Sequence, residues 1–181
     1  MPYIDRLRRT GALLFAISAM SLSPLSSATT ILFVGNSFTY GAGAPPVQAF
    51  RPHTVTDLNG TKIGGVPALF KAMTQQAGLD YDVSLETEGG AGLDFHYQNR
   101  RALIVKPWDV VLLQGYSTLD RDVPGDPGKL IHFSGLLARA LQQQNPRVDV
   151  RLTATWSRAD QTWLASGAWY GKPIRQMALD V

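Results

Sequence analysis

One serine of the chain stands where a nucleophile would be useful. Ser37 follows a short apolar run, residues 31–34, whose unbroken hydrophobicity is typical of a strand buried on both faces of a parallel sheet. The run stops at Gly35, and the small or polar residues Asn36, Ser37 and Thr39 come next. Ligands of open α/β sheets bind beyond the carboxyl ends of the strands, so Ser37 is a candidate for acyl-transfer chemistry. The alternative is an ordinary strand-to-loop turn, since glycine and asparagine are common turn residues.

Two further expected strand ends carry residues that suit the same chemistry. Gly89-Gly90 follows the alternating segment 81–88, and Gln114-Gly115 follows the apolar run 109–113. Acyl transfer by a serine needs hydrogen-bond donors for the developing oxyanion. The backbone N–H groups of a glycine turn can donate, because no side chain blocks close approach, and so can a side-chain amide. A simple turn at Gly90 and a strand cap at Gln114 stay open as alternatives.

The segment GNSFTYG, residues 35–41, resembles the first sequence block of the SGNH hydrolases, which are the GDSL-type esterases and lipases. The resemblance implies that Ser37 is the nucleophile, with Asn36 where the family usually has aspartate. It also implies an oxyanion hole made by the Ser37 N–H, the N–H of Gly90 (or of Gly89, one residue earlier) and the amide of Gln114. The third block departs from the usual Gly-x-Asn-Asp. This chain has LLQGYS there, and its glutamine resembles that of some sugar O-acetylesterase relatives.

The base of such a site is missing from the sequence. SGNH hydrolases carry Asp-x-x-His near the end of the domain, whereas this chain has no such motif and its last histidine is His132. A serine hydroxyl without a positioned base is a weak nucleophile. The resemblance covers residues 30–180, about the N-terminal two-thirds of such a domain. We therefore expect a secreted serine esterase, acting on small-molecule or carbohydrate O-acetyl esters, whose Asp/His pair lies beyond Val181. The alternative is a non-catalytic secreted binding domain or an inactive remnant.

The N-terminus predicts export. Three arginines, Arg6, Arg8 and Arg9, precede an apolar stretch at 11–22, and small residues follow at 26–28, so residues 1–28 are predicted to be a signal peptide. The apolar stretch is short for a spanning helix, which predicts a periplasmic or secreted protein without a stable membrane anchor. Removing residues 1–28 takes away three arginines and one aspartate and leaves 14 basic and 13 acidic residues. This balance gives no reason to expect a nucleic-acid partner.

The composition predicts no cofactor and no metal. The 181 residues include no cysteine, which excludes a disulfide framework and a thiolate metal site. The three histidines, His53, His96 and His132, are too widely spaced in the sequence for a zinc motif. Neither a GxGxxG pattern nor a P-loop lysine follows the first strand, so nucleotide binding fits poorly.

Residues 29–181 are predicted to form one α/β domain. The expected strands are 31–34, 81–88, 109–113 and 148–155, and the expected helices are 67–77, 93–105, 128–144 and one that begins at Lys172. Unbroken apolar runs predict central positions for the first and third strands, whereas alternation places the strand 81–88 near an edge. The alternation of strands with helices predicts a three-layer α/β/α domain with a doubly wound parallel sheet. For the SGNH family this sheet is flavodoxin-like.

Other features leave more than one interpretation open. The stretch 42–66 is expected to be a long irregular loop, either functional or mobile. His96 follows the glycine turn and either lines the pocket or is solvated or hydrogen-bonded in the core. Trp156 and Arg158 follow the fourth strand and are candidates for substrate binding, with packing and a plain surface charge as the alternatives.

Overall fold

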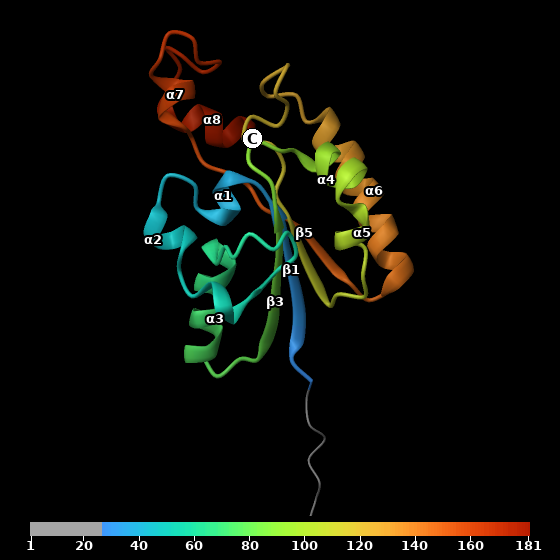
Figure 1. Ribbon diagram of the computed structural model, residues 1–181. Coiled ribbons are helices and arrows are strands. Elements are labelled where there is room, and N and C mark those ends of the chain that lie inside the picture. The colour runs from blue at the N-terminus through green and yellow to red at the C-terminus, as the bar shows by residue number, and fades with distance from the viewer. Residues whose placement is uncertain (1–26) are drawn as a thin grey trace, which may run out of the picture.

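The computed structural model describes residues 27–181, and its centre is a five-stranded sheet in the order β2–β3–β1–β4–β5 (Figure 1). The strands are β1 (Thr29–Gly35), β2 (Thr56–Asp57), β3 (Tyr81–Thr87), β4 (Val110–Leu113) and β5 (Asp149–Leu152). All four pairings are parallel, so the carboxyl ends of the strands share one edge. Most of the predicted signal peptide lies outside the described residues.

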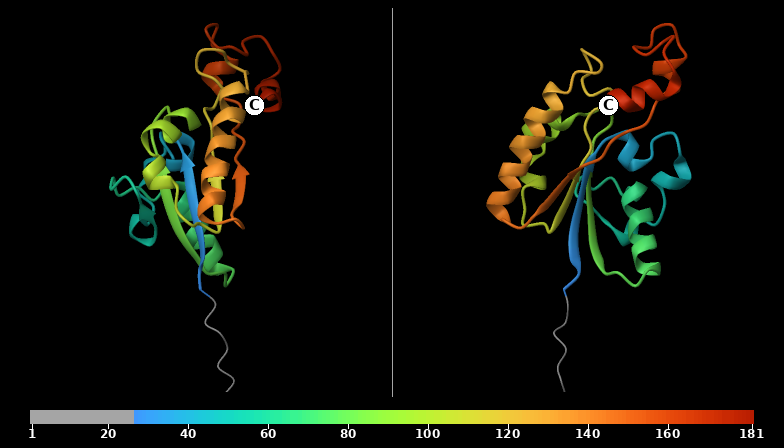
Figure 2. Two further views of the ribbon diagram at one scale, coloured as in Figure 1. Left: turned by 90° about the vertical axis from the view of Figure 1, so that its right-hand side faces the viewer. Right: turned by 180° about the vertical axis from the view of Figure 1, so that it is seen from behind.

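Helices cover both faces of this sheet, as the views in Figure 2 show. One face is covered by α3 (Gly65–Gln76), and the other by α4 (Leu93–Asn99), α5 (Arg101–Ile104) and α6 (Gly128–Gln144). The remaining elements are the short helices α1 (Ser37–Tyr40), α2 (Pro45–Gln48), α7 (Ala159–Thr162) and α8 (Ile174–Asp180), and the 3-10 turn η1 (Pro52–Thr54). The predicted three-layer α/β/α class is confirmed.

Strand β1 is buried on both faces, as its apolar run predicts. Leu32 and Val34 pack in the cluster that includes residues of α4, α5 and α6, whereas Ile31 and Phe33 pack with Phe70 of α3. Alternate side chains of a strand point to opposite faces, so a strand between two helical layers needs an apolar residue at every position. Strands β3 and β4 flank β1, which places it in the middle of the sheet.

The stretch 42–66 is not the irregular loop that was expected, because it contains α2, η1 and β2. The Asp57 carboxylate stabilises the turn over residues 57–63, because it accepts hydrogen bonds from Asn59 N, Thr61 Oγ1 and Ile63 N. Strand β2 has only two residues and pairs with Ser84 and Leu85, so β3 lies one strand in from the edge.

Three other expectations need correction. The helix expected over 93–105 is two helices, separated at Arg100, whose φ of −126° leaves the helical range. Strand β5 has four residues instead of eight. The apolar residues at helical spacing in 67–77 predict a buried Met73, but Met73 is 66% exposed, and Ala68 is buried. Within residues 27–181, no helix is both long and apolar enough to cross a membrane.

Candidate active site

Three strand ends meet at the side chain of Asn36, the residue before the candidate nucleophile. Asn36 is buried, and its Nδ2 donates to the carbonyl oxygens of Ala91, at 2.9 Å, and Gly115, at 3.0 Å. Its Oδ1 accepts from Phe38 N at 3.2 Å and so caps α1. The loops after β1, β3 and β4 are therefore tied together by one amide.

Gln114 completes this network from the end of β4. Its Oε1 accepts from Asn36 N at 3.2 Å and from Thr39 Oγ1 at 2.7 Å. Its Nε2 donates to Asn36 Oδ1 at 2.8 Å and to Gly115 O at 3.1 Å. Gln114 is 3% exposed, and both of its amide hydrogens are engaged. The predicted proximity of Gln114 to the Ser37 loop is thus present, but donation to an oxyanion would require Nε2 to leave one of these acceptors.

Ser37 is the first residue of α1 and is partly exposed. The first N–H groups of a helix have no intrahelical partner, and among residues 27–181 the Ser37 N–H has no hydrogen-bond acceptor. A hollow of about 510 Å³ opens at Ser37. The structure therefore places a serine with an unpaired N–H beside a space where a carbonyl group could bind.

The walls of this hollow are mostly apolar and include Val47, Val66, Leu69, Trp156 and the cation Arg158. Trp156 is 61% exposed, and its ring lies edge-on against Phe38 at 4.5 Å between centroids. Trp156 and Arg158, both singled out from the sequence, thus lie beside Ser37.

Arg158 is held in place by neighbouring side chains. It donates to Ser117 Oγ at 2.8 Å and to Asp160 at 2.6 Å and 3.0 Å. Burial raises the pKa of Asp160, but the Gln161 amide and the Arg158 guanidinium outweigh it, so the net pKa lies below its usual value. An ionised Asp160 neutralises much of the Arg158 charge, which makes Arg158 a weak attractor of anions.

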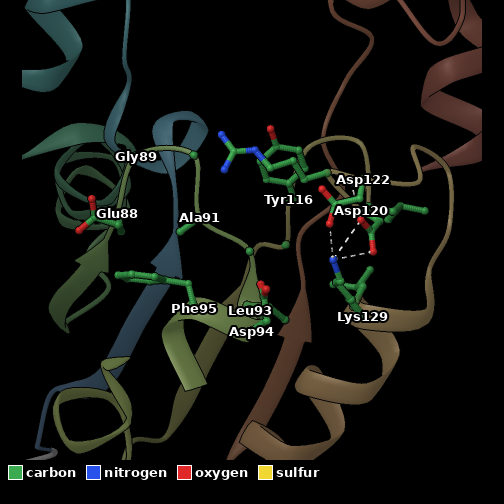
Figure 3. Close-up of a pocket in the computed structure, with 16 residues that line it drawn as sticks. Glu88, Gly89, Ala91, Leu93, Asp94, Phe95, Tyr116, Asp120, Asp122 and Lys129 are labelled. Carbon is green, nitrogen blue, oxygen red and sulfur yellow. Dashed lines mark hydrogen bonds and ion pairs between the residues drawn. The ribbon is translucent and has the colours of Figure 1, made fainter. Parts of the chain in front are cut away.

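The glycine turn after β3 borders a second, polar hollow of about 390 Å³ (Figure 3). Gly90 has φ of +68°, a conformation that favours glycine, and neither it nor Gly89 donates its N–H to an acceptor in the described part of the chain. A Cβ on Gly89 would lie 3.0 Å from Tyr40 Oη, so α1 packs closely against this turn.

Charged side chains line the polar hollow. Lys129 lies between the carboxylates of Asp120 and Asp122, with Nζ 3.1 Å from each, while Glu88 and Phe95 lie on the opposite side (Figure 3). Hydrogen bonds from the Asp122 backbone and from Lys129 lower the pKa of Asp120, although burial opposes them. This lining suits a polar, hydroxyl-bearing group better than an apolar one.

A base for Ser37 is not found between residues 27 and 181. In that range Ser37 Oγ has no hydrogen bond to a histidine or carboxylate. His96 is fully buried, and its Nδ1 lies 2.6 Å from Glu86 Oε2, so the hydrogen-bonded core interpretation of His96 holds. His53 lies in η1 and His132 in α6. The same residues include no group of three His, Cys, Asp or Glu side chains placed to hold a metal ion.

Sequence reasoning did not assign roles to Asn36 and Thr39, although both contact Gln114. Their position directly after a buried strand was the available signal. The hydrogen bond between Asn36 and Gln114 was not predictable from the sequence, because the two residues are 78 positions apart in the chain.

Comparisons with known proteins agree with this architecture. No protein-family model and no curated protein sequence matches the chain. A solved structure from Slackia heliotrinireducens, described as an SGNH hydrolase, has a TM-score of 0.52 at 19% identity, covering 85% of this chain and 70% of its own. The structure of TesA has a TM-score of 0.52 at 17% identity, and the match covers 73% of this chain and 63% of TesA. The Clostridium thermocellum family 3 carbohydrate esterase has a TM-score of 0.50 at 18% identity, and the match covers 72% of this chain and 63% of the esterase.

These identities are low, so the likeness concerns the fold. The chain spans between 63% and 70% of the length of the three structures. These three matches, together with the parallel sheet, show that this chain has the α/β fold of the SGNH hydrolases.

Proposed function

We propose that this chain carries the nucleophile and oxyanion half of a serine esterase site that hydrolyses small-molecule esters. The observation that supports it is the position of Ser37, which has an unpaired N–H in the described chain and lines a hollow next to the point where three strand ends meet. The free N–H groups of Gly89 and Gly90 belong to the turn that Asn36 ties to the same point.

In the proposed reaction, Ser37 Oγ attacks the carbonyl carbon of the ester and its proton passes to a base. The negative charge that develops on the carbonyl oxygen is stabilised by the N–H groups of Ser37 and Gly90. Collapse of this intermediate expels the alcohol, which takes up the proton, and water then hydrolyses the acyl-serine. Gln114 Nε2 joins the donors only when it releases Asn36 Oδ1 or Gly115 O.

The base is proposed to be an Asp/His pair supplied beyond Val181. For the substrate we favour carbohydrate O-acetyl esters. The polar lining of the hollow beside Gly90 fits a hydroxyl-rich alcohol, and one protein of the same fold is a carbohydrate esterase. The arginines and apolar stretch at the N-terminus support a periplasmic or secreted location.

A non-catalytic secreted binding domain is the second candidate. It is favoured by the lack of any base bonded to Ser37 within the described chain. The coding sequence downstream of codon 181 separates the two candidates, because an Asp-x-x-His motif there supports the esterase and an intact stop codon supports the binding domain.

The activity test uses a protein extended past Val181, with 4-nitrophenyl acetate and an acetylated sugar as substrates. We expect hydrolysis that falls at least about 10³-fold in Ser37→Ala, because removal of a nucleophile removes the covalent route. Ser134→Ala serves as the control, since Ser134 is partly exposed on α6 and its hydroxyl bonds only to Ile131 O. Equal hydrolysis by Ser37→Ala and the unmodified protein would eliminate Ser37 as the nucleophile.

A further inference from the structure

A buried hydrogen-bonded pair brackets the glycine turn and has no part in the proposed chemistry. Glu86 near the end of β3 and His96 in α4 are both 0% exposed, and His96 Nδ1 lies 2.6 Å from Glu86 Oε2. A carboxylate oxygen and a ring nitrogen this close form a hydrogen bond, which we assign as Nδ1–H donating to the carboxylate. The turn 87–92 lies between these two residues in the chain, so their hydrogen bond holds the two ends of the turn together.

A second contact closes the same segment further out. Arg100, at the end of α4, lies 3.5 Å from Glu88 and 3.7 Å from Glu86, and its guanidinium also lies over the Phe95 ring. Two carboxylates before the turn are thus held by an imidazole and a guanidinium after it. Inside the turn, Ala91 O accepts a hydrogen bond from Asn36 Nδ2.

Burying the polar Glu86–His96 pair in the core costs free energy of folding, because some of its polar atoms lose their hydrogen bonds to water. In the described part of the molecule, Glu86 Oε1, His96 Nε2 and Arg100 Nε are buried without a hydrogen-bond partner. Apolar side chains of similar volume in place of a buried polar pair often leave a protein equally or more stable. A contribution to stability therefore does not explain the pair, whereas a contribution to geometry does.

We propose that Glu86 and His96 are positioning residues that fix the glycine turn, and with it the N–H of Gly90, relative to Ser37. Three of the four residues 89–92 are glycines, whose backbones are the least restricted of all residues. Oxyanion donors act only from fixed positions, and a displacement of about 1 Å can cost about 10²-fold in rate. The catalytic meaning of this proposal rests on the proposed esterase function, but the geometric part stands without it.

The geometric part is tested by amide hydrogen exchange on the present chain. We expect Glu86→Leu/His96→Leu to exchange the Ala91 amide, which donates to Glu88 O across the turn, about tenfold faster, with no loss of stability in urea. Glu86→Gln keeps an oxygen that accepts the Nδ1–H and should exchange like the unmodified protein. Asp149→Asn/Arg151→Gln, which removes an exposed pair on β5, is the control and should leave the turn unchanged. Arg100→Gln, which loses only the outer contact, is a milder second variant and should give a smaller acceleration.

The catalytic part is tested with the extended protein and 4-nitrophenyl acetate. The double leucine variant should lose about 10- to 100-fold in kcat with little change in KM, whereas Glu86→Gln should keep the kcat of the unmodified protein. Unchanged exchange of the Ala91 amide in the double variant would overturn the positioning role. Faster exchange with an unchanged kcat would confirm the geometric part and overturn the catalytic part. Absence of Ser37-dependent hydrolysis in the unmodified protein would overturn the esterase function instead, and the exchange experiment would still decide the role of the pair.

Discussion

Asn36→Asp is the substitution that examines the site most closely, since it changes one atom group and keeps the shape of the side chain. Asn36 donates through Nδ2 to Ala91 O and Gly115 O and accepts through Oδ1 from Phe38 N and Gln114 Nε2. A carboxylate keeps the two accepted hydrogen bonds and loses the two donated ones. It also places a negative charge near two carbonyl oxygens, at positions now 2.9 Å and 3.0 Å from Nδ2.

The magnitude follows from these four contacts. Each lost hydrogen bond at a buried site costs about 1–2 kcal/mol, and the repulsion between the carboxylate and the carbonyl oxygens adds to this. We expect Asn36→Asp to lower the free energy of unfolding by about 2–4 kcal/mol near neutral pH. Burial and the facing carbonyls raise the folded-state pKa of the new carboxyl group above its unfolded value. The deficit therefore shrinks as the pH falls through that raised pKa, because the protonated acid can donate one hydrogen bond again.

Urea unfolding followed by tryptophan fluorescence measures this effect at about pH 8 and about pH 5. The control is Asn99→Asp, because Asn99 is exposed and its Nδ2 bonds only to Phe95 O. The control should change stability by less than about 0.5 kcal/mol at either pH. An Asn36→Asp protein as stable as the unmodified one at about pH 8 would refute the Asn36 network described above.

Three further predictions use other parts of the structure. A Cβ at Gly35 would meet Thr39 Oγ1 and lie 2.7 Å from Gln114 Oε1, so Gly35→Ala should lower the free energy of unfolding by about 1–3 kcal/mol, as measured in thermal melts. Gly135→Ala on α6 is the control and should raise the free energy of unfolding slightly, because the nearest atom to its Cβ would be 3.5 Å away. Gly90→Ala and Gly78→Ala both place alanine at positive φ in open space, so each should cost about 1 kcal/mol, but only Gly90→Ala should slow ester hydrolysis by the extended protein. Hydrogen bonds from the Thr30 backbone and hydroxyl lower the pKa of Asp109, so its contribution is present at neutral pH and lost as the pH falls through that lowered pKa. In acid titrations of stability, the difference between the unmodified protein and Asp109→Asn should begin to shrink only below about pH 4, where a free aspartate titrates, and should vanish below the lowered pKa.

The sheet and its site-bearing edge were predictable because their signals are local. The apolar runs of β1 and β4 hold no polar residue, and a strand of that kind is stable only between two covered faces. Helix α6 has leucines at helical spacing, and Asp126 accepts from Gly128 N at its start, as expected of a helix start. The placement of Ser37 at a strand end followed directly from these elements.

What was not predictable depends on partners far apart in the chain. The strand 81–88 alternates apolar and polar residues, yet Glu86 is buried, with its carboxylate 2.6 Å from His96 Nδ1. A two-residue strand such as β2 has no periodicity to detect, and it forms because β3 offers it an edge. Gln114 was recognised as an amide at the right strand end, but its engagement with Asn36 and Thr39 is visible only in three dimensions.

Covalent labelling of Ser37 is the most direct test of the proposed site. A fluorophosphonate reacts with a serine hydroxyl only where that hydroxyl is activated and its phosphoryl oxygen can be stabilised. We predict that a protein extended past Val181 is labelled at one residue, that peptide mass spectrometry maps the label to Ser37, and that Ser37→Ala abolishes it. An active, extended protein that is labelled at another serine, or that hydrolyses esters without any label on Ser37, would contradict the account.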